Sequence, residues 1–381
     1  MKWSAVSVAA FCFVALCSAC SGPAPGPAPR HHALSLTGTR DCVPNNGVLS
    51  GAEIVDAKVR WLPAGSFDFI HNGGNDVGGS GTYVRPPAVM KVMDGSSPLT
   101  YASDLAAAFE KTPPWYRKSL CGLDAVFVFE PDSSNSQGGS PSGWAFWETP
   151  DQALQAYQND NTQPIAPQQF IGISSSIWSL LKTNSDPLGA YETQVLQTLL
   201  QFQSPATYPS VASTVAGNSD PWSLTLLGIL SHELGHVLWH SECSRGCDEV
   251  HRYGWTDVGT VAHLHKFGAT GDAIPLKPDY YYTVPDVAAD WTTNSGNPPA
   301  SKLYKLYFSG IWPSLFGFVA PDEDMAETIK LLILSKSGLS SLTVKLSASV
   351  VKDMVTYLKQ GSSAPLLKKA KQIRGSLQSG D

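Results

Sequence analysis

The sequence has little charge and no excess of basic residues. Asp, Glu, Lys and Arg make up 15% of its 381 residues, and the formal net charge is −6 at pH 7. Proteins that bind nucleic acid through phosphate contacts carry the opposite sign, so the composition argues against a nucleic-acid partner. Internal repeats are absent, and no apolar run beyond the N-terminal segment is long enough for a transmembrane helix. The 43% hydrophobic content indicates a globular protein with a large core.

The first 20 residues are typical of a targeting segment. The apolar run 4–16 follows a basic residue and is too short to span a bilayer comfortably, as in a signal peptide. Small residues precede Cys20, so the segment resembles a bacterial lipoprotein signal in which Cys20 is lipidated. Cleavage without lipidation is the alternative, because Cys17 stands where such signals usually carry Leu. Residues 21–40, rich in Pro and Ala, predict a tether that cannot pack a core.

Four of the seven cysteines lie beyond the targeting segment. An even number in an exported chain predicts two disulfides. We expect a local bridge between Cys243 and Cys247 and a second bridge, Cys42 to Cys121, that fixes the N-terminal arm to the body. Metal binding by Cys243 and Cys247 is the alternative.

The stretch DPWSLTLLGILSHELGHVLWH, from Asp220 to His240, predicts one buried helix. Asp220 is a good N-cap, and Pro221 is tolerated as the first helical residue. The following residues are apolar on nearly every side, which is typical of a helix inside a large core. Polar groups placed in such a helix are costly to bury unless something pairs with them, and a metal ion would do so.

The polar groups of this helix have the spacing of a zinc site. His232 and His236 are four residues apart, so both imidazoles can bind one ion, and Glu233 can take a proton from a zinc-bound water as general base. Gly235 would let another backbone or a substrate come close. One alternative is a pair of core histidines beside an exposed Glu. A metal-free hydrolase using Ser231 is another, although adjacent helical residues do not face each other.

A second helix is predicted from Pro321 to Ser335, PDEDMAETIKLLILS. Acidic residues crowd its first turn, where the helix dipole favours negative charge, and its apolar residues form a buried stripe. Glu323 and Glu327 are four apart and share a face. We expect Glu323 to be the third zinc ligand and Glu327 to accept a hydrogen bond from one histidine, which fixes its tautomer. An ordinary helix start with dipole-stabilising acids is the alternative.

HELGH followed far downstream by EDMAE resembles the gluzincin zinc metallopeptidases, in the branch with an E-x-x-A-E ligand helix that includes lethal-factor and Mlc-titration-factor peptidases. The resemblance implies one zinc ion on His232, His236 and Glu323, with Glu233 as catalytic base. It also implies an edge strand that binds the substrate backbone, for which Phe170–Ile177 is the candidate. The metzincin pattern is excluded, because it needs Gly and His three and six residues after His236.

The sequence departs from the gluzincin pattern in two respects. A long insertion separates the two motifs, and it contains three more histidines, His251, His263 and His265. No tyrosine stands out as the one that some members use to stabilise the oxyanion, and Tyr304 and Tyr307 are the candidates.

Strand and helix patterns together predict the α+β class. Strands are expected at Ala125–Phe129, Gly143–Trp147 and Phe170–Ile177, and further helices at Ser103–Lys111, Tyr191–Phe202 and Val344–Lys359. The resemblance adds a zincin-like arrangement, with a mixed sheet over the HExxH helix and a second ligand helix. The expected units are a signal peptide (1–20), a tether (21–40), an N-terminal arm (41–102), a metallopeptidase domain (103–339) and a C-terminal helix with a basic tail (340–381).

These patterns predict a zinc-dependent metallopeptidase that hydrolyses peptide bonds in a peptide or protein substrate. It would be exported, either to the bacterial cell envelope, where a lipid on Cys20 would anchor it to the membrane, or as a secreted protein. The alternative is a catalytically inactive zinc-binding surface lipoprotein that acts in binding or adhesion.

Overall fold

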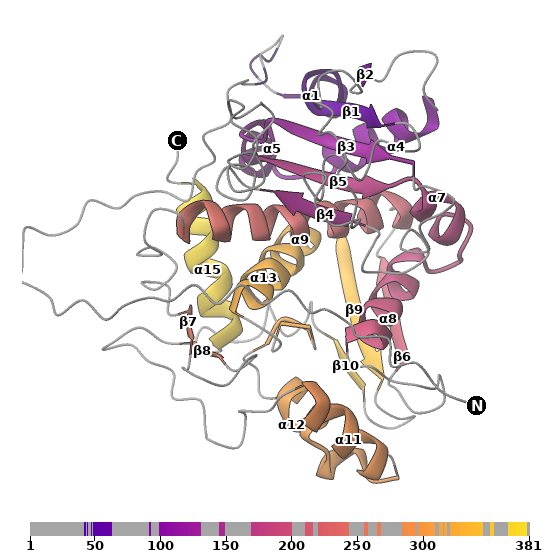
Figure 1. The fold of residues 1–381 in the computed structure, drawn as a ribbon, viewed down its shortest axis with the longest axis vertical. Coiled ribbons are helices and arrows are strands. Elements are labelled where there is room, and N and C mark those ends of the chain that lie inside the picture. Colours follow the sequence, from indigo (N-terminus) through magenta and orange to yellow (C-terminus); the bar gives the residue numbers. More distant parts are fainter. Residues whose placement is uncertain are drawn as a thin grey trace, which may run out of the picture.

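The computed structural model describes residues 42, 44, 47, 49–62, 91–92, 99–130, 145–148, 169–199, 210–215, 220–243, 255–257, 265–267, 284–294, 296–308, 312–314, 316–317, 321–345, 351–353 and 365–378. These residues combine helices with a small, partly parallel sheet, which confirms the expected α+β class (Figure 1). Across these ranges no helix has both the length and the apolar character needed to cross a bilayer.

The central sheet has five strands in the order β2-β1-β3-β5-β4. The inner three pair in parallel, whereas β2 and β4 are antiparallel to their neighbours. The strands are β1 (Val59–Leu62), β2 (Lys91–Val92), β3 (Ala125–Phe129), β4 (Ala145–Glu148) and β5 (Phe170–Ser174).

Strands β3 and β5 form the buried centre of this sheet. Every residue of both strands is buried, as expected for parallel strands covered on both faces. The prediction that Phe170–Ile177 is an edge strand is therefore wrong, because β5 lies between β3 and β4. The strand also ends earlier than expected, since a short helix, α7 (Ser176–Leu181), begins directly after it.

The N-terminal region belongs to the same folded unit as the sheet. Helix α1 (Gly51–Lys58) leads directly into β1, and α4 (Leu99–Glu110) runs across the boundary expected at residue 102. Ser103 does not cap this helix, because it lies inside it and its hydroxyl donates to the Thr100 carbonyl. A disulfide links Cys42 to Cys121 at the end of α5 (Pro114–Cys121), which confirms that bridge.

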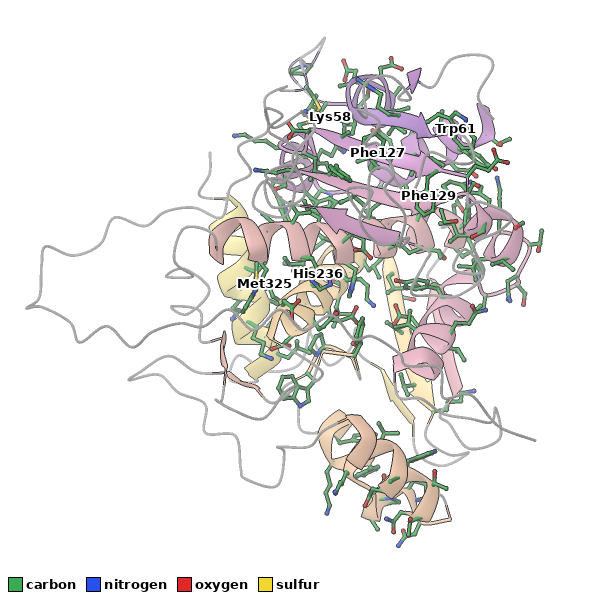
Figure 2. All side chains as sticks on the ribbon, viewed as in Figure 1. Lys58, Trp61, Phe127, Phe129, His236 and Met325 are labelled. Carbon is green, nitrogen blue, oxygen red and sulfur yellow. A yellow bond between two sulfur atoms is a disulfide. The ribbon has the colours of Figure 1, made fainter. Side chains whose placement is uncertain are left out.

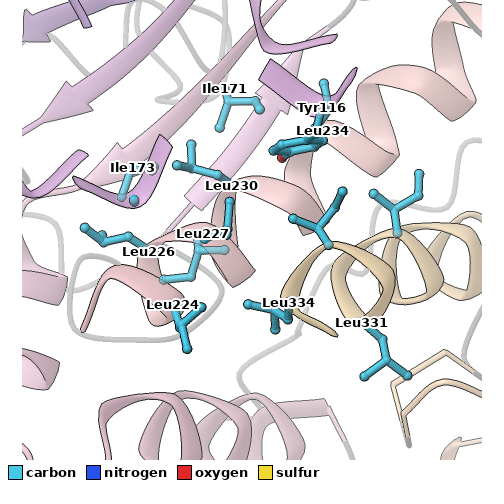
Figure 3. Close-up of a cluster of buried hydrophobic side chains, with 14 of the residues drawn as sticks. Tyr116, Ile171, Ile173, Leu224, Leu226, Leu227, Leu230, Leu234, Leu331 and Leu334 are labelled. Carbon is cyan, nitrogen blue, oxygen red and sulfur yellow. The ribbon is translucent and has the colours of Figure 1, made fainter. Parts of the chain in front are cut away.

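The long buried helix is α9 (Pro221–Cys243), which lies against one face of the sheet (Figure 1). Its leucines meet β5 and neighbouring elements in a dense apolar cluster (Figure 3). Helix α9 also packs against α4 and against two later helices, α8 (Pro187–Leu199) and α13 (Pro321–Lys336). Further elements are α11 (Val284–Asn294), η5 (Pro298–Ala300), α12 (Lys302–Phe308), β7 (Trp255–Asp257) and β8 (His265–Phe267).

The C-terminal prediction of a helix over Val344–Lys359 is wrong. Strand β9 (Leu339–Lys345) joins β6 (Ser210–Val215) and β10 (Val351–Asp353) in a separate antiparallel sheet. The helix comes later, as α15 (Pro365–Gln378), in the segment expected to be a basic tail. One basic residue of that segment, Lys369, is fully buried and forms an ion pair of 2.5 Å with Asp324 of α13, so α15 is anchored to α13.

Candidate metal centre

Helix α9 begins as the sequence predicts. Asp220 accepts hydrogen bonds at Oδ1 from the backbone N–H groups of Trp222 and Ser223, at 3.0 and 3.2 Å. These bonds satisfy two of the donors that a helix start leaves unpaired. From Trp222 to Leu238 every residue is buried, so the polar groups His232, Glu233 and His236 lie in the interior.

A glycine lets α13 come unusually close to the histidine helix. A Cβ atom at Gly235 would lie 2.5 Å from the Cα of Ala326 and 2.9 Å from its Cβ, both too short for real contacts. Only Gly opposite a small residue permits this approach, which brings the first turn of α13 to the histidines. His236 and Met325 mark the two helices in Figure 2. The close backbone approach expected at Gly235 is therefore found, and the approaching element is the second ligand helix.

Three side chains meet at this crossing. The Nε2 atoms of His232 and His236 are 3.1 Å apart, and Glu323 Oε2 lies 3.4 Å from the first and 3.3 Å from the second. Both histidines are buried, and the Glu323 side chain is 19% exposed. The structure thus brings together the three residues that the sequence singled out as ligands.

The spacing of these three atoms fits a metal ion. In a tetrahedral zinc site with bonds of about 2.05 Å, ligand atoms lie about 3.3 Å apart, which is close to all three distances here. Glu323 Oε2 makes no hydrogen bond within the described residues, although it is buried. Buried oxygens normally accept a hydrogen bond, so one that faces two imidazole nitrogens without such a bond is consistent with a metal ligand. The group could therefore hold a metal ion.

Each histidine also has a carboxylate at its other ring nitrogen. His232 Nδ1 lies 2.7 Å from Glu327 Oε1, and His236 Nδ1 lies 3.4 Å from Asp322 Oδ2. Because a carboxylate only accepts, these contacts favour a proton on Nδ1 and leave Nε2 free to bind a cation. Burial lowers the pKa of His236, but Glu323 and Asp322 outweigh it and hold that pKa well above its usual value.

Of these two carboxylates, the sequence indicated only Glu327. Asp322 appeared merely as one of three acids in a first turn, yet in the structure each acid has its own partner. Asp322 contacts His236, Glu323 contacts both histidines, and Asp324 pairs with Lys369. Acidic residues in a first turn are favoured by the helix dipole in any case, so the sequence pattern does not show which of them also interact with a cationic group.

Glu233 is buried beside the first histidine, with 7% of its surface exposed. Burial raises the pKa of its carboxyl group, and the two histidines only partly oppose that effect. Burial raises the pKa of the Tyr116 hydroxyl well above its usual value, and the neighbouring Ser231 acts on it in the opposite direction. Ser231 Oγ makes no hydrogen bond to His232 within the described residues, which does not favour it as a nucleophile activated by that histidine.

A buried charge cluster extends the site toward α8. Lys330 Nζ lies 2.6 Å from Glu327 Oε1 and 2.8 Å from Glu192 Oε1. Burial raises the pKa of Glu327, but Lys330 and the hydrogen bond with His232 outweigh it and bring that pKa to about 2. Burial also raises the pKa of Glu192, and there it outweighs Lys330. The sequence shows Lys330 as an i,i+3 partner of Glu327 but contains no signal that links Glu192 to the site.

Two aromatic residues near the site were also missed. Phe316 stacks on the His232 ring, with centroids 5.4 Å apart and planes 13° apart. Tyr191 of α8 is buried, and burial followed by the charge of Glu233 raises the pKa of its hydroxyl well above its usual value. Tyr304, one of the two candidate oxyanion donors, stacks on Phe308 of its own helix, with ring centroids 4.4 Å apart.

Several predicted features lie outside the described residues. These are the targeting segment with Cys20, the bridge of Cys243 to Cys247, the side chain of Tyr307, and the histidines of the insertion apart from the backbone of His265 in β8. Comparison of the chain with known protein families, with curated proteins and with solved structures gives no match.

Proposed function

We propose that the chain is an exported, zinc-dependent metallopeptidase of the gluzincin type. The observation that carries the proposal is the convergence of His232, His236 and Glu323 at tetrahedral spacing, with the buried Glu233 beside them. Two imidazoles and one carboxylate suit zinc better than magnesium or calcium, which prefer oxygen ligands alone. Three protein ligands are also the number found in catalytic zinc sites, where a fourth position serves water or substrate.

The side chains around this group divide the chemistry among them. When bound, zinc supplies a Lewis acid that lowers the pKa of a water ligand and polarises a peptide carbonyl. Glu233 takes the proton of the attacking water on its carboxylate, and burial raises the pKa of that group in the direction that favours accepting a proton. Glu327 and Asp322 hold the two rings with Nε2 toward Glu323. Tyr191 is buried and its raised pKa keeps its hydroxyl protonated, which makes it a candidate donor to the developing oxyanion.

The substrate backbone has a natural docking edge at β4. This strand is antiparallel to β5 and, among the described strands, pairs with β5 alone. It also packs against α9, the helix that carries both histidines. An unpaired strand edge offers backbone donors and acceptors to an extended peptide, which would lie as an added strand beside the metal. This arrangement favours cleavage within a chain, and it moves the substrate-binding role from β5 to β4.

Export and anchoring form part of the same proposal. The signal-like segment and the Pro/Ala-rich stretch favour a bacterial cell-envelope lipoprotein held by a lipid on Cys20, or a secreted enzyme. The Cys42–Cys121 disulfide supports an oxidising compartment.

The test measures zinc content by mass spectrometry and hydrolysis of casein and of a peptide library. We expect one zinc ion per chain and cleavage by the wild type. Glu233→Gln should keep the zinc and lose hydrolysis, whereas Glu323→Ala should lose both. Undiminished zinc in Glu323→Ala would remove the third ligand. A wild-type protein that holds zinc but cleaves nothing would favour the alternative, a catalytically inactive zinc-binding surface lipoprotein that acts in binding or adhesion.

A further inference from the structure

The ammonium group of Lys330 bridges two carboxylates that come from different helices. It lies 2.6 Å from Glu327 on its own helix α13 and 2.8 Å from Glu192 on α8. The side chains of all three are nearly or fully buried, with exposed fractions of 2%, 0% and 7% for Lys330, Glu327 and Glu192. Charged groups buried this deeply are kept only where each has close partners, so the three depend on one another.

One oxygen of this cluster connects it to the metal centre. Glu327 Oε1 forms the ion pair with Lys330 Nζ and also lies 2.7 Å from His232 Nδ1, with which it shares a hydrogen bond. Glu327 Oε2 makes no hydrogen bond within the described residues, so the carboxylate is oriented through Oε1. A lysine stem is flexible and does not fix its own ammonium group. Glu192, the second carboxylate in contact with Nζ, therefore helps to determine where that group lies.

We infer that Glu192 and Lys330 are positioning residues of the metal centre, which hold Glu327 against His232 and so make metal affinity and geometry depend on helix α8. This inference rests on the metal site of the proposed function but not on its peptidase activity. Glu192 is three contacts away from His232, through Lys330 and Glu327, and it belongs to a helix that supplies none of the three proposed ligands.

The same helix provides a matched comparison. Lys369 and Asp324 form a second fully buried ion pair on α13, at 2.5 Å, but this pair joins α13 to α15. If buried ion pairs on α13 merely hold the helix in place, breaking either pair should disturb metal binding alike. If the inference is correct, only the pair connected to His232 affects the metal.

The experiment uses the full-length protein and two readouts besides activity. These are the zinc dissociation constant, from competition with a chromophoric chelator, and the absorption spectrum of the Co²⁺-substituted protein, which reports ligand geometry. We expect Glu192→Gln to weaken zinc binding about 10–100-fold, as is usual for partners of metal-binding histidines, and to change the Co²⁺ spectrum. Lys369→Met should lower the melting temperature but leave both readouts at wild-type values.

A double-variant cycle tests whether Glu192 acts through Glu327. The double variant Glu192→Gln/Glu327→Gln should bind zinc no more weakly than Glu327→Gln alone. Once Glu327 is changed, the contact through which Glu192 acts on His232 is already lost. Wild-type affinity and spectrum in Glu192→Gln would overturn the inference, as would losses that add in the double variant. A wild-type protein without zinc affinity would overturn the inference and the proposed function together. Tight zinc binding without peptide cleavage counts against the proposed function alone.

Discussion

The two sides of helix α9 are buried in different ways. On the sheet side, leucines such as Leu226, Leu230 and Leu234 are fully buried among apolar neighbours that include Ile171 and Ile173 (Figure 3). On the other side, polar groups meet specific partners on α13 at hydrogen-bond or ion-pair distances. Apolar burial scales with area and volume, whereas a buried charge depends on individual contacts. The two sides should therefore respond differently to change, and the sheet side should fold without the metal.

Removal of the metal should have the largest effect on the polar side. A ligand that binds only the folded state stabilises it by about 4 kcal/mol when its free concentration is 1,000 times its dissociation constant. We therefore expect the free energy of unfolding in urea to fall by about that amount when zinc is removed with a chelator. The zinc-free protein should still be folded in the absence of urea. Glu323→Ala is the control and should show no zinc-dependent gain. Equal stability with and without zinc in the wild type would remove the proposed difference between the sides.

Leu230→Ala should reveal the opposite behaviour on the sheet side. Leu230 is fully buried, so its truncation removes apolar contacts and leaves a cavity, which costs about 3 kcal/mol of unfolding free energy. The histidines project from the other side of the helix, so zinc affinity of the folded protein should stay at its wild-type value. Chemical unfolding combined with chelator competition measures both quantities. A tenfold loss of zinc affinity in this variant would show that the sides are coupled.

Gly235→Ala should affect both properties at once, because it lies where the helices cross. Its new Cβ would meet the Ala326 backbone at 2.5 Å, which backbone atoms cannot avoid unless α9 and α13 separate. We expect a loss of about 1–3 kcal/mol, typical of overpacking, together with weaker zinc binding.

Gly228→Ala is the matched control on the same helix. A Cβ there would be 3.5 Å from the nearest atom, a Leu334 methyl group, which is an ordinary contact. It should therefore gain up to about 1 kcal/mol from helix propensity and leave zinc binding unchanged. Similar behaviour of the two glycine variants would contradict the close approach at Gly235.

The parts of this molecule that local patterns encode were predictable from the sequence. The start of α9 follows from the capping residue Asp220 and from Pro221. The start of α13 follows from Pro321 and from the acidic residues of its first turn. The meeting of His232, His236 and Glu323 followed from motif spacing and resemblance. A capping box at Ser50 and Glu53, where each side chain bonds the other's backbone N–H, would have indicated α1 as well.

Features that depend on distant segments could not be predicted in this way. The position of β5 inside the sheet is decided by β4, which pairs on its far side, and no pattern within β5 reports that neighbour. Lys369 had the appearance of a solvated tail residue until its partner Asp324 was known. The end of strand β9, from Val344, was mistaken for the start of a helix, although the buried residues Leu342 and Val344 of this strand already alternate.

The smallest expected effect concerns the N-cap, which lies at the end of α9 and belongs to neither side. Asp220→Ala removes the acceptor for the N–H groups of Trp222 and Ser223, which should cost about 1 kcal/mol. Asp220→Asn keeps an acceptor and should lose only a few tenths of that. His232 is twelve residues further on, about 18 Å along the axis, so fraying of the first turn should not reach it. Unfolding in urea measures the loss, and the Co²⁺ spectrum reports the site. If Asp220→Ala shifted that spectrum, α9 would respond as one rigid unit, and the independence of its two sides would be lost.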